Sequence, residues 1–464
     1  MKRIIHRVLL LWILVPLFSL AQNSSNFARE AVLADLDYLY EALQQTHIDA
    51  FAYMSPKELE QAYQKTRATI IQDSLSGLEA TELLQPFVAQ LKNGHTAIPF
   101  PIPEYIAYAS EGGSLFPLEV ILHEGDYKVT ANWSKESRIV PGTRLLAING
   151  EPIAEIFKNL YRQLSGERLY YLQAKAEYFS LPRLYWQIYG PQDTFKVSVE
   201  LSGQIQELEL SSVAALDDFE YNRTDAVNAE MNLELTANAA ILNPGSFKDD
   251  LNIYKAFIDS SFVEINKRNL PNLIIDLRGN GGGDDSFADY LTSYIADKPF
   301  KWCSEFKLRS SRQLKEALAP NRDTTSAYQN AIFSKAEGEV FDYDFPLYQP
   351  QPVSRRYQGK IYVLINRHSY SQAAVTAAQI QDYGWGTIVG EETAEYPSLY
   401  ASVFNFSLPN TGIPVVVSKG LIVRVSGDRS ERGVLPDIEI ANNPFDSEDQ
   451  QLKKLLQILK QPLD

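Results

Sequence analysis

The second half of the sequence predicts an α/β fold, in which short apolar strands alternate with helices. Apolar runs rich in β-branched residues are typical of strands buried on both faces, and the stretches between them have helical composition. Such alternation favours a layered structure of sheet and helices. Strands are expected at residues 239–242, 273–275, 361–365 and 387–389, and helices at residues 253–267, 286–296 and 371–381.

The first residues have the features of a secretory signal peptide. Three basic residues flank or precede the apolar run 8–20, and Ser19-Leu20-Ala21 fits a small-x-small cleavage site. The run is shorter than the ~20 residues of a membrane span, although an uncleaved anchor is the alternative. Residues 1–21 are therefore predicted to be removed, and the mature protein is expected to be exported to the periplasm or the extracellular space.

The composition of the chain argues against some classes of binding partner. The chain has 464 residues, 45% of them hydrophobic, which is enough for more than one core. Loss of residues 1–21 removes three of 43 basic residues, so 40 remain against 58 acidic residues and the net charge becomes −18. A chain this acidic is poorly suited to nucleic acid or to anionic lipid.

The sequence also predicts that neither a disulfide nor a metal is used. Cys303 is the single cysteine, which excludes an intrachain disulfide. The chain has no His-x-x-x-His pattern and no cysteine pair, so metal ligands are not indicated. We therefore expect a protein that needs no cofactor.

A helical unit is expected over residues 22–100. Residues 28–43 place apolar side chains three and four positions apart, as in an amphipathic helix. A capping-box pattern at residues 55–58 begins a second helix. A third helix is expected over residues 79–92, and His95 follows its end.

Short strands are expected over residues 101–215. The run Gly142-Thr143-Arg144-Leu145-Leu146-Ala147-Ile148-Asn149-Gly150 resembles a turn and strand of PDZ domains, and residues 153–164 would form the following helix. A generic hairpin closed by Asn149-Gly150 explains the same residues. Residues 195–201 alternate between apolar and polar side chains, which suggests a closing hairpin.

Residues 360–384 predict a buried strand, a short polar turn and a helix. The turn delivers the hydroxyl of Ser371 to the first turn of the helix, beside backbone N–H groups that have no partner within the helix. A serine nucleophile and half of an oxyanion hole can share such a turn. The alternative is that Ser369 or Ser371 only caps the helix.

A glycine-rich turn follows the strand expected near residue 275. The glycines from Gly279 to Gly283 allow consecutive N–H groups to converge on one point, as in an anion-binding nest. A phosphate loop is the alternative, but no Lys-Ser or Lys-Thr follows, and Asp284 and Asp285 would repel phosphate. Adjacent carboxylates rarely face each other across a sugar, which disfavours glycoside cleavage. An oxyanion hole fits better.

These motifs, in this order, resemble those of the tail-specific or C-terminal processing peptidases, peptidase family S41. The matching motifs are Asn93-Gly94-His95-Thr96, the PDZ-like run, Asp276-Leu277-Arg278-Gly279-Asn280 with its glycines, Ser371, Gly390-Glu391-x-Thr393 and Gly433-Val434-x-Pro436-Asp437. The resemblance covers nearly the whole mature chain. It implies a helical unit, a PDZ-like domain over residues 101–215 and an S41-type α/β core over residues 236–464.

The resemblance also implies a catalytic design. In the Ser-Lys branch of the family a lysine follows the Gly-Glu-x-Thr turn, where this chain has Ala394-Glu395-Tyr396, and no lysine occurs between Lys360 and Lys419. The other branch, which resembles the tricorn protease core, pairs the serine with a histidine and a glutamate. Carried over to this sequence, the triad is Ser371, His95 and Glu431.

The chemistry of these side chains agrees with the implied triad. A seryl hydroxyl needs an imidazole to remove its proton, and the imidazole needs a carboxylate to orient it and to stabilise its cation. His368 is the rival base because it lies on the same turn as Ser371. Glu391, Glu392 and Asp382 are the rival carboxylates.

The oxyanion hole would combine the N–H of Gln372 with one from Gly282 or Gly283. The sequence thus predicts an exported serine endopeptidase that forms an acyl-enzyme on Ser371 and acts on polypeptides, with C-terminal or extended segments as the parts it would bind. The alternative is a catalytically inactive protein of the same fold that binds peptides or lipids.

Overall fold

The computed structural model describes residues 26–446 and 448–460, so the predicted signal peptide, residues 1–21, lies outside the described residues. The chain divides into two compact units. The first unit comprises Met1–Thr224, Arg309–Val340 and Ser402–Lys419, and the second unit comprises Asp225–Leu308, Phe341–Ala401 and Gly420–Asp464. Within residues 26–446 and 448–460, no helix is both long and apolar enough to cross a membrane.

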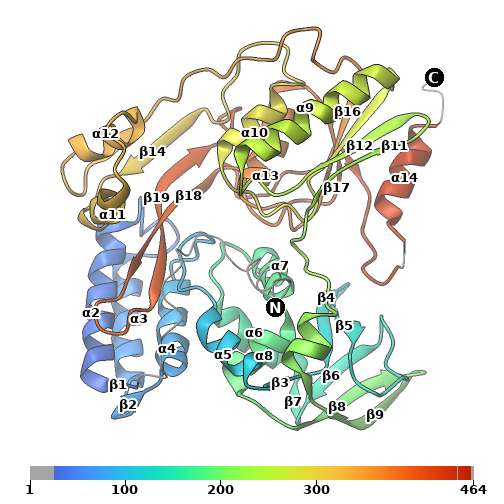
Figure 1. The fold of residues 1–464 in the computed structure, drawn as a ribbon. Helices are drawn as coiled ribbons and strands as arrows, with labels where there is room; N and C mark the ends of the chain where they lie inside the picture. The colour runs from blue at the N-terminus through green and yellow to red at the C-terminus, as the bar shows by residue number, and fades with distance from the viewer. Residues whose placement is uncertain (1–25, 447, 461–464) are drawn as a thin grey trace. The chain divides into compact units, whose positions relative to one another are not determined.

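Three helices of the first unit lie side by side (Figure 1): α2 (Arg29–Thr46), α3 (Pro56–Thr69) and α4 (Gly77–Ala89). The capping box predicted at Ser55 and Glu58 is present, so α3 begins where the sequence indicates. A second capping box, formed by Ser76 and Glu79, begins α4 two residues earlier than expected. The short strands β1 (Phe27–Ala28) and β2 (Ser74–Leu75) pair with each other, and α5 (Ile102–Ser110) follows.

The first unit also contains a six-stranded sheet with the order β4-β5-β6-β8-β9, to which β7 adds beside β6. Its strand pairs are antiparallel. The strands are β4 (Leu118–His123), β5 (Asp126–Asn132), β6 (Arg144–Ile148), β7 (Glu151–Pro152), β8 (Thr194–Leu201) and β9 (Gln204–Ser211). The expected hairpin over residues 195–201 is confirmed as β8 with β9.

One apolar core joins this sheet to three helices, α6 (Ile153–Gln163), α7 (Leu169–Phe179) and α8 (Leu181–Tyr189). The strands β3 (Ser114–Leu115) and β10 (Val213–Ala214) pair beside it, and the π-helix Ala215–Glu220 follows. The helix expected over residues 153–164 is α6. That this sheet is a PDZ-like domain stays a prediction.

The second unit is built on a six-stranded sheet with the order β11-β12-β13-β16-β17-β20. β11 joins β12 in antiparallel fashion, and the remaining pairs are parallel. The four predicted strands are confirmed as β12 (Ala239–Pro244), β13 (Asn272–Asp276), β16 (Lys360–Ile365) and β17 (Thr387–Gly390). The outer strands β11 (Met231–Leu235) and β20 (Ile438–Glu439) were not predicted.

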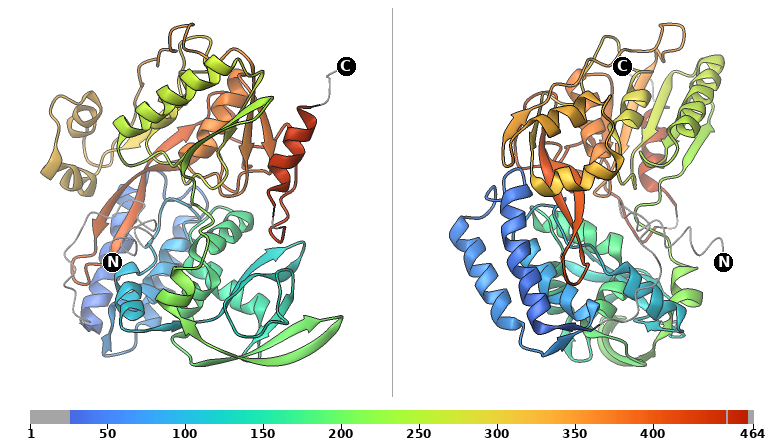
Figure 2. Two further views of the ribbon diagram at one scale, coloured as in Figure 1. Left: turned by 45° about the vertical axis from the view of Figure 1, so that its right-hand side comes forward. Right: turned by 60° about the vertical axis from the view of Figure 1, so that its left-hand side comes forward.

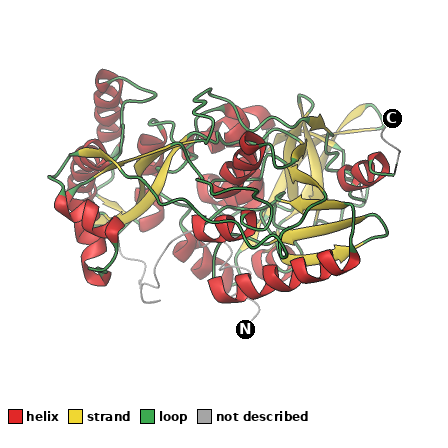
Figure 3. Cartoon of the chain, turned by 90° about the horizontal axis from the view of Figure 1, so that it is seen from above, coloured by secondary structure: helices red, strands yellow, loops and turns green. Residues whose placement is uncertain are grey.

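Helices cover both faces of this sheet (Figures 2 and 3). One face packs against α9 (Leu251–Arg268), α10 (Asp285–Thr292) and α13 (Gln372–Tyr383). The other face packs against the C-terminal helix α14 (Gln450–Ile458). Because both faces are covered, the central residues of the inner strands are apolar, which confirms the α/β prediction.

A further sheet has four strands in the order β15-β14-β19-β18. Its elements are β14 (Glu305–Arg309), α11 (Arg312–Leu318), the 3₁₀ turn Ala319–Asn321, α12 (Ala327–Ser334), β15 (Val340–Asp342), β18 (Leu399–Ser407) and β19 (Pro414–Val423).

Two segments that the sequence assigns to the core, residues 309–340 and 402–419, belong to the first unit. Residues 402–419 contact the first unit in part because Val416 pairs with Ala97, which lies far away in the chain. The other predicted domain boundaries, at residues 100, 215 and 236, stay predictions.

Candidate active site

Ser371 stands between the end of β16 and the first residue of α13. Its backbone angles are φ 50° and ψ −122°, which place a residue with a β-carbon in a left-handed region that costs energy. Its side chain makes no capping hydrogen bond, so the alternative that Ser371 only caps the helix is not supported. A strained turn from strand to helix is also how some hydrolases expose a nucleophilic serine.

Ser369 has a structural role in the same turn. Its side chain is fully buried, and its hydroxyl donates to the carbonyl of Leu277 at 2.8 Å and accepts from the N–H of Asn366 at 3.2 Å. The hydroxyl therefore ties the turn to the end of β13. His368 is also buried and lies edge-on to the ring of Tyr370, with ring centres 6.0 Å apart.

The glycine turn after β13 lies directly against Ser371. A β-carbon on Gly282 would be 2.6 Å from the carbonyl oxygen of Tyr370 and 2.7 Å from the backbone nitrogen of Gln372. Gly282 also has a φ of 76°. Only glycine fits at this position, and the structure brings together the Ser371, Gln372, Gly282 and Gly283 of the sequence prediction.

The buried side chain of Asn280 fixes the path of this turn. Its Nδ2 donates to the carbonyl of Gly245 and its Oδ1 accepts the N–H of Gly282, both at 2.8 Å. The N–H of Tyr370 donates to the carbonyl of Asn280 at 3.0 Å. One asparagine thus links the glycine turn to the serine turn.

These bonds distinguish the candidate oxyanion donors. The N–H of Gly282 is already donated to Asn280. The N–H groups of Gly283 and Gln372 have no acceptor among residues 26–446 and 448–460. Gln372 is the first residue of α13, where an N–H has no partner within the helix. We therefore expect Gly283 and Gln372, rather than Gly282, to supply the donors.

His95 belongs to the first unit, on the turn after α4, and is half-buried. The turn is held through the backbone N–H and carbonyl of its neighbour Gly94. The N–H of Gly94 donates to Glu167 Oε1 at 2.8 Å, and the carbonyl of Gly94 accepts from Lys175 Nζ at 2.6 Å. A β-carbon on Gly94 would lie 2.2 Å from the ring of Tyr171.

Asn93 anchors the same turn from its other side. Its Oδ1 accepts the hydroxyl of Ser418 at 2.7 Å and lies 3.3 Å from Nε2 of His47. Burial lowers the pKa of His47 to about 4, so its imidazole is neutral. Because Nδ1 of His47 accepts the N–H of Asp49 at 3.0 Å, the proton is on Nε2, which donates to Asn93. His47 is thus a structural histidine.

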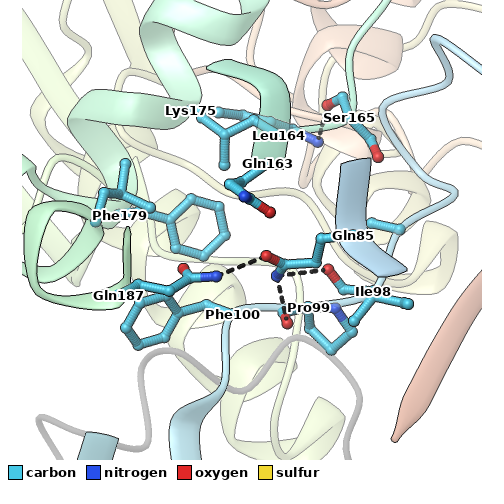
Figure 4. A pocket seen from close by; sticks show the side chains of 12 residues that line it. Gln85, Ile98, Pro99, Phe100, Gln163, Leu164, Ser165, Lys175, Phe179 and Gln187 are labelled. Atoms are coloured by element: carbon cyan, nitrogen blue, oxygen red, sulfur yellow. Dashed lines mark hydrogen bonds between the residues drawn. The ribbon is translucent and has the colours of Figure 1, made fainter. Parts of the chain in front are cut away.

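A small pocket of the first unit lies beside the His95 turn (Figure 4). Gln187 Nε2 donates to Gln85 Oε1 at 2.6 Å, and Gln85 Nε2 donates to the carbonyl of Pro99 at 2.9 Å. Lys175 also lines the pocket, and its amine is bound by the carbonyls of Gly94 and Ser165. Lys175, at the wall of the pocket, therefore holds the His95 turn, and the pocket is assigned no chemical role.

The predicted carboxylate, Glu431, is exposed. Within the described parts of the second unit it makes no hydrogen bond or ion pair. Its rivals hold other segments: Glu391 accepts the N–H of Asn442 at 2.8 Å, and Glu392 accepts the N–H of Gly433 at 2.7 Å. Asp382 forms a two-point ion pair with Arg424, with contacts of 2.7 and 3.0 Å.

The sequence prediction missed Glu395, which the structure places at Ser371. The side chain is 1% exposed, and its Oε2 accepts the N–H of Ser371 at 2.5 Å. The sequence offered one clue, because Glu395 lies in the stretch where the Ser-Lys branch has its lysine. No group of three or more His, Cys, Asp or Glu side chains suited to a metal occurs within the described ranges.

Comparisons with known proteins show which family and fold the chain is similar to. Residues 242–440 match the model of peptidase family S41. The tail-specific protease of Haemophilus influenzae is 28% identical over 132 residues, which are 28% of this chain and 14% of that protein. This chain thus matches only a small part of that relative.

Two solved structures share the fold. Mature CPAF complexed with lactacystin has a TM-score of 0.67 and 18% identity, and mature CPAF alone has a TM-score of 0.63 and 17% identity. Each match covers 93% of this chain and 97% of the CPAF chain. The mixed α/β fold is therefore shared over most of the sequence. Residues 242–440 are thus similar to peptidase family S41, a family of serine peptidases.

Proposed function

We propose that this protein is an exported serine endopeptidase that hydrolyses peptide bonds of polypeptides through an acyl-enzyme on Ser371. The observation that carries the proposal is the arrangement around Ser371. A serine held at a left-handed turn has Gly282 packed against its backbone, and two N–H groups nearby, on Gly283 and Gln372, have no acceptor within the described residues.

The proposed mechanism begins with the removal of the Ser371 proton by His95. The seryl oxygen attacks the substrate carbonyl, and Gly283 and Gln372 donate to the oxyanion that forms. His95 then protonates the leaving amine, and water hydrolyses the acyl-enzyme with His95 again as base. Glu431 would orient His95 and stabilise its cation.

The Ser-His-Glu design is part of the proposal, and the position of the lysines supports it. The segment after Thr393 carries Glu395 in place of a lysine. Lys419, the next lysine after Lys360, is bound in the first unit by the carbonyls of Ser402 and Val403 and by the hydroxyl of Ser402. Export and a PDZ-like role for residues 101–215 are proposed from the sequence motifs.

A serine-reactive fluorophosphonate, with intact-protein mass measured, tests the proposal. We expect one adduct per chain on the wild type and none on Ser371→Ala, together with cleavage of an unfolded polypeptide by the wild type only. Labelling at another residue, or no labelling of a folded wild type, would overturn the assignment of the nucleophile.

A second candidate function is peptide or lipid binding by a catalytically inactive protein. The exposed position of Glu431, without a hydrogen bond inside the described part of its unit, favours this candidate. The same experiment decides between them, because a binding protein would retain a peptide without cleaving it and would not react with the probe.

A further inference from the structure

We propose that Glu395 is a positioning residue for the nucleophile, which makes it a second functional carboxylate besides Glu431. The inference rests on the proposed function, because it assumes that Ser371 is the nucleophile. It concerns a residue to which neither the sequence motifs nor the family match gives a role.

The contact itself is the first argument. Oε2 of Glu395 accepts the N–H of Ser371 at 2.5 Å, and the glutamate side chain is 1% exposed. A carboxylate that accepts from a backbone N–H forms a charge-assisted hydrogen bond, which is stronger than a bond between neutral groups. Burial shields this bond from competing water, so it constrains the peptide of Ser371 directly.

The strain at Ser371 is the second argument. A non-glycine residue with φ near 50° and ψ near −122° persists only where its surroundings hold it there. Two neighbouring segments bind consecutive N–H groups here: the carbonyl of Asn280 accepts the N–H of Tyr370, and Glu395 accepts the next N–H, that of Ser371. Without Glu395, the restraint on the N–H of Ser371 itself is lost, while the bonds of Tyr370 and Ser369 remain.

The assignment of oxyanion donors is the third argument. Because Ser371 donates its own N–H to Glu395, that N–H is not available to a substrate oxygen. Beside this serine, the N–H groups of Gln372 and Gly283 have no acceptor within the described residues. By accepting the N–H of Ser371, Glu395 leaves Gln372 and Gly283 as the candidate oxyanion donors, and it also holds the backbone of the serine.

The supports of Glu395 come from the C-terminal motif. The hydroxyl of Thr393 donates to the carbonyl of Glu395 at 2.8 Å and accepts the N–H of Val434 at 2.8 Å. A β-carbon on Gly433 would lie 1.9 Å from the carbonyl oxygen of Thr393, so the two segments touch through a glycine. Gly433 and Val434 therefore contact the loop that carries Glu395 and hold it in place.

The test compares Glu395→Gln and Glu395→Ala with the wild type, and uses Asp35→Asn as a matched control. Asp35 is also fully buried, and it accepts the N–H groups of Asn410 and Thr411 within the first unit. We expect kcat to fall about 10-fold in Glu395→Gln, which keeps a neutral acceptor, and about 100-fold in Glu395→Ala, with KM changed less than about twofold. Asp35→Asn should lose thermal stability but keep the kcat of its folded fraction.

Two further readouts separate positioning from folding. With a fluorophosphonate, the Glu395 variants should still label completely, but with a lower rate constant, whereas misfolding would lower the labelled fraction. Amide-hydrogen exchange at Ser371 should be slow in the wild type and faster in Glu395→Ala, whether or not the protein is a peptidase.

The outcomes are distinguishable. If the wild type does not react with the probe but exchange at Ser371 is faster in Glu395→Ala, the proposed function is overturned, while the hydrogen bond between Glu395 and Ser371 is supported. A Glu395→Ala variant with unchanged exchange at Ser371, or with more than half of the wild-type kcat, would overturn the role of Glu395. A loss of kcat in Asp35→Asn as large as in Glu395→Ala would show that the effect is general destabilisation.

Discussion

The turn that carries Ser371 and the turn that carries His95 are held by different kinds of atoms. At Ser371, close backbone contacts add to the side-chain bonds of Glu395 and Ser369: a left-handed φ, a glycine in van der Waals contact and a backbone bond from Tyr370 to Asn280. Side chains dominate at His95, where Glu167 accepts the N–H of Gly94 and Lys175 donates to the carbonyl of Gly94.

This difference implies different sensitivities. A turn fixed by close backbone contacts should fail when a single β-carbon is added, because packed backbone atoms cannot move aside. A turn fixed by side-chain donors and acceptors should weaken gradually as each is removed, because the remaining bonds still restrain it. The five predictions below test this comparison, from the largest expected effect to the smallest.

The nucleophile itself should show the largest effect. Ser371→Ala should lower kcat/KM by ~10⁴-fold or more, because the attacking oxygen is lost. Ser371→Gly should be equally inactive but more stable by about 1 kcal/mol, since glycine adopts the left-handed region without strain. Peptide hydrolysis and thermal unfolding measure the two effects.

Ser369→Ala is the control for the nucleophile. It removes a buried hydroxyl that bonds Leu277 and Asn366, so stability should fall by about 1 kcal/mol while the folded protein still labels with a fluorophosphonate. An inactive Ser369→Ala beside an active Ser371→Ala would reverse the assignment.

The proposed base should come next. His95→Ala should lower kcat by ~10³-fold or more, because proton removal from the seryl hydroxyl is lost. His368→Ala should keep most activity per folded molecule, since His368 packs edge-on against Tyr370 in the buried turn. Steady-state kinetics on one unfolded polypeptide compares the two variants, and a larger loss for His368→Ala would make His368 the base.

Much of the second unit's sheet could be predicted from the sequence. Its inner strands are buried on both faces, so they appear as short apolar runs, and all four were located. The strand β20 has two residues, too few to show a period, and β11 is an edge strand that is mostly exposed. The assignment of residues 309–340 and 402–419 to the first unit depends on long-range pairing, which no local pattern records.

The candidate site was predictable where backbone geometry demands particular residues. Gly282 and Ser371 lie in turns that punctuate strong strand and helix patterns, and the structure brings them together. Glu395 was not predicted, because its position in the lysine stretch gives no sign that its side chain is buried against Ser371. The role of Asn280 was missed for the same reason, since its bonds to Gly245 and Gly282 depend on the path of the chain.

Gly282 provides a direct test of the backbone-held turn. Gly282→Ala should lower kcat by ~10²-fold or more, because the new β-carbon would lie 2.8 Å from Cβ of Ser371 and within 2.7 Å of two backbone atoms of the turn. Gly281→Ala is the matched control. Its β-carbon would meet only a methyl group of Val227, at 2.9 Å, which can rotate away. Equal losses in the two variants would mean that the whole glycine turn is sensitive, and not its contact with Ser371.

Lys175 tests the side-chain-held turn. Lys175→Met removes the donor to the carbonyls of Gly94 and Ser165, and we expect kcat to fall about 10-fold, as for one hydrogen bond to a charged group. Lys158→Met, which removes an exposed lysine of the same unit paired with Glu155, should leave kcat unchanged. A fall in kcat of more than ~10³-fold in Lys175→Met would show that the His95 turn is as sensitive to a single substitution as the Ser371 turn.

The smallest effect on activity, and the clearest effect of pH, should come from Lys419. This residue follows Ser418, which binds Asn93 and Thr96 in the His95 turn. Burial lowers the pKa of Lys419 to about 7 from the ordinary 10.5. Between these two values the unfolded chain holds the proton and the folded chain does not. Lys419 therefore makes the free energy of unfolding increase as pH rises above about 7, and this increase is lost as pH falls back to 7.

Lys419→Met should remove this dependence on pH. At pH near 6 the variant should be more stable than the wild type, because it buries no charge. At pH near 9 the wild type should regain the advantage, because its neutral amine still donates to Ser402 and Val403. We expect the difference in unfolding free energy to change by about 2 kcal/mol between these two conditions, measured by thermal unfolding with kcat changed less than about twofold. Parallel stability curves for the two proteins would mean that Lys419 keeps its charge in the folded state, and that the strand beside the His95 turn tolerates a buried ammonium.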